Sequence, residues 1–137
     1  MDPQVWGKHY WFFLHTAALT YPHHPNAITK KRYYELITNF ALFIPTEIIA
    51  KEFEHLIDVF PVAPYLDNRD SLVRWTHFIH NKINAKLEKP QISLEEFYHD
   101  YFELYKDKTP EYRRLKERLV YGGIVMSIFG IIYYFYE

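Results

Sequence analysis

The most constraining feature of this chain is a run of residues without charge near its C-terminal end. Residues 119–136 read LVYGGIVMSIFGIIYYFY. As a helix this run would be about 27 Å long, which is just enough to cross the hydrocarbon core of a bilayer. A helix on the surface of a small soluble domain needs a polar face, and this run has none. We therefore expect a single-pass transmembrane anchor at 119–136. The alternative is a helix buried in the globular domain.

The residues at the two ends of this run predict its orientation. Tyrosines gather at its far end, where amphipathic rings favour the interface, and basic residues precede it at Arg113, Arg114, Lys116 and Arg118. Positive charge on this flank predicts that the preceding domain stays on the cytoplasmic side. Residues 106–118 are expected to form a charged connector, helical from Glu111 onward.

Residues 1–105 have the apolar periodicity of helices. The spacing predicts four helices over 5–20, 29–43, 46–60 and 71–87, with Thr29, Thr46 and Ser71 as N-terminal caps of the last three. Ser93 with Glu96 three residues later is a capping box, which predicts a short fifth helix to about residue 105. No segment favours a strand. We expect an all-α fold: a four-helix bundle with a short fifth helix over 1–105, the connector over 106–118 and a C-terminal transmembrane helix over 119–136.

Charge and cysteine content exclude several classes of function. Sixteen Lys and Arg residues oppose 17 Asp and Glu residues, so the formal net charge is -1 and nothing favours nucleic-acid binding. The 137 residues contain no cysteine. A disulfide, a zinc–thiolate site or a thiol nucleophile therefore cannot be built from these residues alone.

Two segments have a specific pattern. The first reads WGKHYWFFLHT from Trp6 to Thr16 and is followed by Tyr21-Pro22. The second begins at Trp75 and continues with HNKINAKLEKP over 80–90. Together they resemble the Erv/ALR FAD-linked sulfhydryl oxidases, above all the short versions of large DNA viruses. The resemblance covers about residues 5–100 and implies a four-helix bundle with a short fifth helix that holds FAD between helices.

The side chains in these segments have chemistry suited to a flavin dinucleotide. Asn81 and Asn84 are three residues apart on one helix face, tryptophans offer flat surfaces for a fused ring, and lysines could meet a pyrophosphate. The candidate cofactor-binding residues are Lys8, Trp11, His15, Trp75, His80, Asn81, Asn84, Lys86 and Lys89. The alternative is a polar helix face in water with the tryptophans in the core. Lys8 stands where the family usually has arginine.

The chain departs from the family at the active site. The resemblance implies a Pro-Cys-x-x-Cys sequence at the start of the third helix, where the helix N-terminus lowers the thiol pKa. This chain has Pro45-Thr46-Glu47-Ile48-Ile49, so Thr46 and Ile49 stand at the two cysteine positions. Ser93 stands near the place of a further family cysteine. The resemblance thus implies the fold and argues against the activity.

Two Glu-x-x-His pairs, Glu52/His55 and Glu96/His99, have the spacing used in di-iron bundles. Such a site needs two further inward carboxylates, and none is specifically placed. We expect surface pairs and no metal.

These observations favour a catalytically inactive, sulfhydryl-oxidase-like protein that is anchored in a membrane and serves as a structural or docking module. The specific hypothesis is a link between the internal membrane of a virion and its capsid or shell proteins. The second hypothesis is an FAD-binding thiol oxidoreductase subunit that depends on a cysteine-bearing partner. Because the family usually dimerises through its first two helices, a homodimer is also expected, with Phe12, Leu19, Tyr34 and Phe40 as its apolar stripe.

Overall fold

The computed structural model describes residues 1–106 and 111–136, and every regular element in these ranges is helical. The elements are α1 (Pro3–Leu19), α2 (Ala27–Thr38), the 3₁₀ helix η1 (Phe40–Phe43), α3 (Glu47–Val59), the 3₁₀ turn η2 (Ala63–Tyr65), α4 (Arg69–Lys86), α5 (Leu94–Glu103) and α6 (Glu111–Tyr136). The expected all-α class is confirmed. Residues 107–110 of the predicted connector lie outside the described residues.

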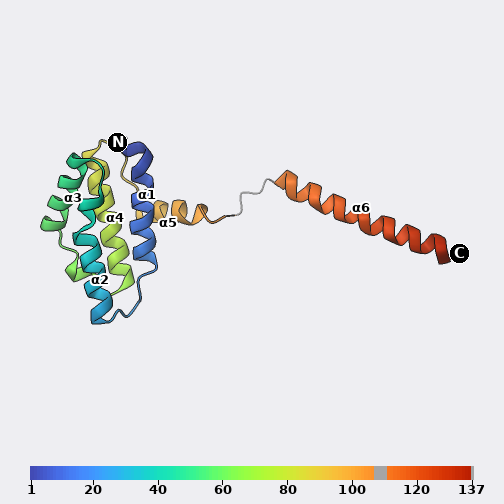
Figure 1. Cartoon of the computed structure of the whole chain (residues 1–137), viewed down its shortest axis with the longest axis horizontal. Coiled ribbons are helices and arrows are strands. Elements are labelled where there is room, and N and C mark those ends of the chain that lie inside the picture. Colours follow the sequence, from blue (N-terminus) through green and yellow to red (C-terminus); the bar gives the residue numbers. More distant parts are fainter. Residues whose placement is uncertain (107–110, 137) are drawn as a thin grey trace. The chain divides into compact units, whose positions relative to one another are not determined.

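The chain forms two compact units, Met1–Phe102 and Glu103–Glu137. In the first unit α1, α2, α3 and α4 make the bundle and α5 packs on α1 through a hydrogen bond of 2.8 Å between Tyr101 and Thr16 (Figure 1). The buried residues of this core lie between Leu14 and Tyr101, and partly buried side chains such as Trp6, Tyr10 and Trp11 pack against them. Because this core is complete without the second unit, residues 1–106 are expected to fold alone.

Two of the predicted helix caps are wrong. Asn26 caps α2 by accepting a hydrogen bond from the backbone N–H of Thr29, and Asn68 caps α4 by accepting one from the N–H of Ser71. In each case the N-cap is an asparagine three residues earlier in the sequence. Its extended backbone lets the side chain reach the N–H in the first turn of the helix. The capping box of Ser93 and Glu96 is confirmed in both directions.

The second helix is shorter than predicted. It ends at Thr38, and the chain then turns through η1, which buries Phe40 and Ala41 and leaves Leu42 and Phe43 exposed. Phe40 is only 6% exposed, so it belongs to the core and is not available for the dimer stripe to which the sequence pattern assigned it.

The Tyr21-Pro22 step locks the loop after α1. The Tyr21 ring is fully buried, and its hydroxyl donates a hydrogen bond of 2.8 Å to the carbonyl of Leu66. The Arg69 side chain donates to the Tyr21 carbonyl from the start of α4. This motif residue therefore ties the end of α1 to the η2–α4 corner and sets the register between α1 and α4.

The second unit contains α6, a helix that is long and apolar enough to cross a membrane. Tyr112–Tyr136 has a mean hydropathy of 1.7 in its most apolar window, and none of that window is buried. The basic residues that precede the apolar run in the sequence lie at the start of α6. One of them, Arg113, forms an ion pair with Glu117 at 3.4 Å. The expected C-terminal apolar helix is therefore present in the structure.

Candidate functional site

The two sequence motifs meet where α1 packs on α4. Trp11 of α1 stacks on His80 of α4 with ring centroids 4.0 Å apart and ring planes 14° from parallel. One turn further along α1, His15 Nε2 lies 2.9 Å from His80 Nδ1. Phe97 of α5 covers the His15 ring at 4.5 Å. We call Trp11, His15 and His80 the ring cluster. It joins three of the predicted cofactor-binding residues.

Both histidines of the ring cluster are neutral near pH 7. Burial, together with the smaller effects of the neighbouring His80 and His77, lowers the pKa of His15 to about 3. Burial also lowers the pKa of His80 to about 4, with His77 and Lys89 as additional causes. In neutral imidazoles one nitrogen donates and the other accepts, so a single bond can join Nε2 of His15 to Nδ1 of His80. The other nitrogen of His15, Nδ1, is buried and has no hydrogen-bond partner among residues 1–106 and 111–136.

Asn81 and His77 hold the segment that leads into α5. The Asn81 side chain donates to the carbonyl of Ile92 at 2.8 Å and accepts from the N–H of Ile92 at 3.1 Å. His77 Nε2 lies 2.9 Å from the same carbonyl and donates to it. Both amide atoms of Asn81 are thus used inside the protein. Sequence reasoning missed this role of His77, although its spacing of four residues from Asn81 places the two on one helix face.

The end of α4 positions the lysines of the second motif. Glu88 has a left-handed backbone with φ 55°, and the N–H of Lys89 donates at 2.8 Å to the carbonyl of Asn84. Lys86 pairs with Glu52 of α3 at 3.4 Å. Lys89 is exposed and lies near enough to His80 to lower its pKa. Lys86 is therefore paired with a residue of α3, whereas Lys89 lies near His80 of the ring cluster.

Trp75 is buried, whereas Lys8 is exposed to solvent. Trp75 is 3% exposed, and its indole N–H donates to the carbonyl of Phe60 at 2.9 Å, so it joins the end of α3 to α4. Lys8 lies on α1 one turn before Trp11 and is exposed. It has no ion pair within residues 1–106 and 111–136.

The positions of the lost cysteines lie at the start of α3. Thr46 is the N-cap residue of α3, but its hydroxyl makes no cap bond and instead lies 3.4 Å from the carbonyl of Met1. Ile49 is 8% exposed and packs in the core. The first position is therefore a hydroxyl at the surface, and the second is an aliphatic side chain that helps to fill the bundle. Neither can exchange electrons with a dithiol.

The donor set around the ring cluster fits part of a flavin dinucleotide. The partnerless Nδ1 of His15 and the exposed ammonium groups of Lys8 and Lys89 are the groups that would meet a nucleotide and its phosphates. At 4.0 Å, the Trp11–His80 stack leaves no space for a ring between them, so a flat ring would pack beside this pair.

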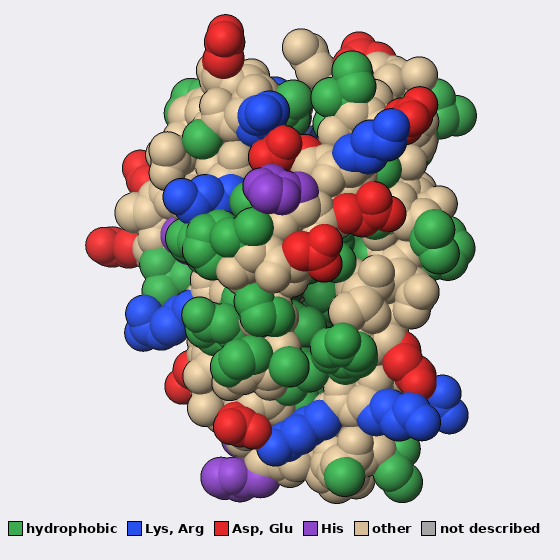
Figure 2. Space-filling model, turned by 90° about the vertical axis from the view of Figure 1, so that its left-hand side faces the viewer, with side chains coloured by type: hydrophobic (Ala, Val, Ile, Leu, Met, Phe, Trp, Pro, Cys, Tyr) green, Lys and Arg blue, Asp and Glu red, His purple; other side chains and the backbone are tan. Residues whose placement is uncertain are grey.

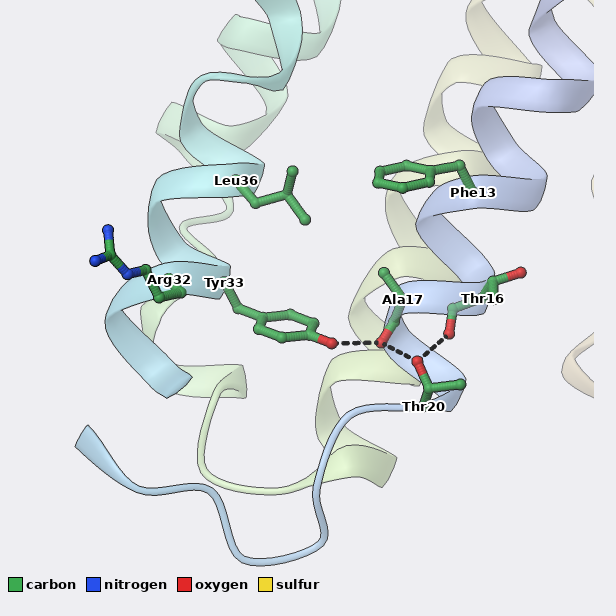
Figure 3. Close-up of a pocket in the computed structure, with 7 residues that line it drawn as sticks. All are labelled: Phe13, Thr16, Ala17, Thr20, Arg32, Tyr33 and Leu36. Carbon is green, nitrogen blue, oxygen red and sulfur yellow. Dashed lines mark hydrogen bonds between the residues drawn. The ribbon is translucent and has the colours of Figure 1, made fainter. Parts of the chain in front are cut away.

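Two cavities lie beside α2, away from the ring cluster. One of about 430 Å³ lies between α1 and α2, where Phe13, Tyr33 and Leu36 approach one another and the Tyr33 hydroxyl donates to the carbonyl of Ala17 (Figure 3). The other, of about 490 Å³, is bordered by α2, α3 and the chain after α3. None of the nine candidate cofactor-binding residues lines either cavity.

The Glu-x-x-His pairs bring no metal-binding group together. Glu52 is paired with Lys86, and His99 contacts Asp100 at 3.2 Å. In the part of the chain that the structure describes, no three His, Asp or Glu side chains converge.

Comparison with known proteins shows what this chain is similar to. The model of the Erv1 / Alr family matches residues 8–103. A probable FAD-linked sulfhydryl oxidase of Acanthamoeba polyphaga mimivirus is 31% identical over 97 residues, which are 70% of this chain and 68% of that protein. The mitochondrial FAD-linked sulfhydryl oxidase of Saccharomyces cerevisiae is 34% identical over 90 residues, 66% of this chain and 47% of that protein. The match thus spans about two thirds of the viral protein and about half of the yeast protein.

A solved structure shows the same fold. The FAD-binding domain of Erv1 from Saccharomyces cerevisiae superposes with a TM-score of 0.67 at 31% identity, covering 75% of this chain and 96% of that domain. The shared part is therefore the bundle that carries both motifs.

Proposed function

The chain belongs to the Erv1/Alr family, and on that basis we propose that it is a catalytically inactive member whose bundle serves as a docking module held at a membrane by α6. The observation that carries the proposal is the loss of the dithiol. Thr46 and Ile49 occupy the two cysteine positions, and no other cysteine exists among the 137 residues to replace them. Because the core packs around Ile49, the substitution is integrated into the bundle.

The charge pattern of α6 supports a cytoplasmic bundle on a single-pass anchor. Basic residues precede the apolar run, and cytoplasmic flanks are the ones enriched in Lys and Arg. Among the relatives is a protein of a large DNA virus. We therefore propose the internal membrane of a virion as the location and a capsid or shell protein as the partner.

A thiol titration tests the loss of activity. The purified full chain is mixed with FAD and a reduced dithiol substrate, and free thiols are counted over time. They are expected to decline no faster than in FAD alone. A decline that scales with the concentration of the chain would overturn the proposal.

The second candidate function is an FAD-binding thiol oxidoreductase subunit whose flavin would accept electrons from the dithiol of a cysteine-bearing partner. It is favoured by the buried, partnerless Nδ1 of His15 next to exposed lysines. Flavin bound there would supply a two-electron acceptor, while Lys8 and Lys89 would hold its phosphates. A yellow preparation whose flavin remains after desalting supports this candidate. A colourless chain that does not bind added FAD excludes it.

We expect the bundle to form a homodimer through α1 and α2. Phe13 and Tyr34 are 49% and 46% exposed on these helices, and Phe13 borders the cavity of Figure 3. Phe12 contributes less, because it stacks on Tyr101 at 5.5 Å. Light scattering of residues 1–106 should give twice the chain mass, and Phe13→Arg should give the monomer.

Val59→Arg is the matched control for the dimer. Val59 is 52% exposed on α3, outside the expected interface, so this variant should remain dimeric. A monomer mass for the unmodified chain at high concentration would contradict the dimer.

A further inference from the structure

Five large apolar side chains at one end of the bundle are exposed to solvent. They are Met1 (92% exposed), Val5 (63%), Leu42 (75%), Phe43 (64%) and Ile48 (76%), which we call the apolar tip. They come from the residue before the N-cap of α1, from the first turn of α1, from η1 and from the start of α3. None of them is needed to complete the core, because their neighbours Phe40, Ala41 and Ile49 already fill it.

Two hydrogen bonds bring the three segments of the apolar tip together. The Tyr10 hydroxyl of α1 donates to the carbonyl of Phe43 at 2.8 Å, and Thr46 Oγ1 lies 3.4 Å from the carbonyl of Met1. The first turn of α1 therefore lies against the corner between η1 and α3. In Figure 1 the N-terminus lies at the end of the bundle where α3 begins. Thr46, at the position of the first lost cysteine, lies at this corner.

This surface is distinct from the apolar region on the side of the bundle. Figure 2 shows hydrophobic side chains gathered across the middle of the face that carries α2 and α3, with charged side chains around them. The second cavity, between α2 and α3, is lined in part by the acidic side chains of Glu54 and Asp58. At the tip, by contrast, the acidic groups are already engaged: Glu47 pairs with Lys51 at 2.7 Å, and Asp2 accepts from the N–H of Gln4.

The length of the tether keeps a bilayer within reach of the tip. The four residues between Lys106 and α6 can span at most about 14 Å, and the charged first two turns of α6, residues 111–118, add about 12 Å. The longest helix of the bundle, α4 with 18 residues, is about 27 Å long. A tethered surface meets its target at a high effective concentration, so even weak affinity suffices.

The chemistry of the tip suits the interface of a bilayer. Aliphatic and aromatic side chains next to a cation are typical of proteins that lie on a membrane surface. Lys8, one turn after Val5, is exposed and has no ion pair among the described residues, so it is free to meet a lipid phosphate. Burial of apolar side chains in the lipid favours binding roughly in proportion to the area removed from water, and several such side chains are available here.

We propose that the apolar tip docks into the lipid surface of the same membrane that α6 crosses. The inference rests on the proposed membrane tether. Docking would turn Thr46, at the position of the first lost cysteine, towards the lipid. The end of the bundle that would receive a dithiol substrate would then be covered by membrane, and the α2–α3 face would remain open for protein partners.

The absence of cysteine allows a site-specific test. Leu42→Cys and, as the matched control, Val59→Cys are labelled with an environment-sensitive dye in the full chain and reconstituted into phosphatidylcholine vesicles. The dye at 42 should be quenched by brominated acyl chains and protected from aqueous iodide. The dye at 59 should show the opposite. Phe43→Ser with Ile48→Ser should abolish the lipid quenching at 42.

Three other results are possible, and each would contradict the inference for a different reason. If both dyes are quenched by iodide while α6 resists carbonate extraction, the anchor holds and tip docking is wrong. If the chain is extracted by carbonate, the tether itself fails. If the dye at 42 is protected from both quenchers and chains cross-link through position 42, the tip is an interface between copies and not a lipid-binding surface.

Discussion

Full-length chain should remain in the membrane pellet after extraction with alkaline carbonate, whereas residues 1–117 should be released. Nine residues of the run 119–136 are Leu, Ile, Val or Phe, and none is charged. Each such residue contributes about 0.3–0.6 kcal/mol to insertion at the helix centre, so together they favour insertion by about 4 kcal/mol. In water the same side chains are exposed, since no part of the apolar window of α6 is buried. Fractionation followed by immunoblotting measures the distribution.

A single substitution in α6 tests whether this helix inserts into the membrane. Ile128 lies near the middle of the run, and an arginine there costs about 3 kcal/mol, which offsets most of the gain. Ile128→Arg should therefore move much of the chain into the soluble fraction, whereas Ile128→Leu should not. A full-length chain that is soluble and monodisperse without detergent would contradict both the anchor and the tethered function.

The bundle is expected to lose several kcal/mol of stability between pH 7.5 and pH 5. In the unfolded chain His15 and His80 have pKa values near 6.5, whereas in the bundle these fall to about 3 and about 4. Below pH 6.5 the unfolded state therefore binds protons that the folded state excludes. Stability is complete above pH 6.5 and falls as the pH decreases towards the folded values. At pH 5 the loss is on the order of 2 kcal/mol for each histidine.

Urea unfolding of residues 1–106 across this range measures the slope. His15→Gln removes one of the two groups, so it should flatten the pH dependence even if it lowers stability at neutral pH. His24→Gln, in the exposed loop after α1, should leave the slope unchanged. Equal free energies of unfolding at pH 7.5 and pH 5 would show that the two rings are not buried as a neutral pair.

Helical periodicity and the two motifs were sufficient to predict the fold. The capping box at Ser93 was predictable because both of its partners lie within three residues. The end of α2 was not, because η1 forms where Phe40 reaches Tyr10 and Phe53 from other helices. Local pattern determines local bonds, whereas the ends of helices depend on side chains that lie far apart in the sequence.

The candidate site could be predicted only in part for the same reason. The meeting of His15 with His80 follows from two motifs that face each other across the bundle. The hydrogen bond from Trp75 to Phe60 and those between Asn81 and Ile92 depend on loop backbone that no spacing reveals. The apolar tip could not be predicted either, because Leu42, Phe43 and Ile48 are residue types that usually lie in a core, and only the structure shows that they are exposed.

Dioxygen consumption tests most directly whether this chain has the fold of an oxidase without its activity. The full chain, reconstituted in vesicles and supplied with FAD and a reduced dithiol substrate, is compared in an oxygen electrode with FAD alone and with an active family member. Because Thr46 and Ile49 replace the dithiol, the rate should equal that of FAD alone at every protein concentration. Turnover that rises in proportion to the chain would contradict this account.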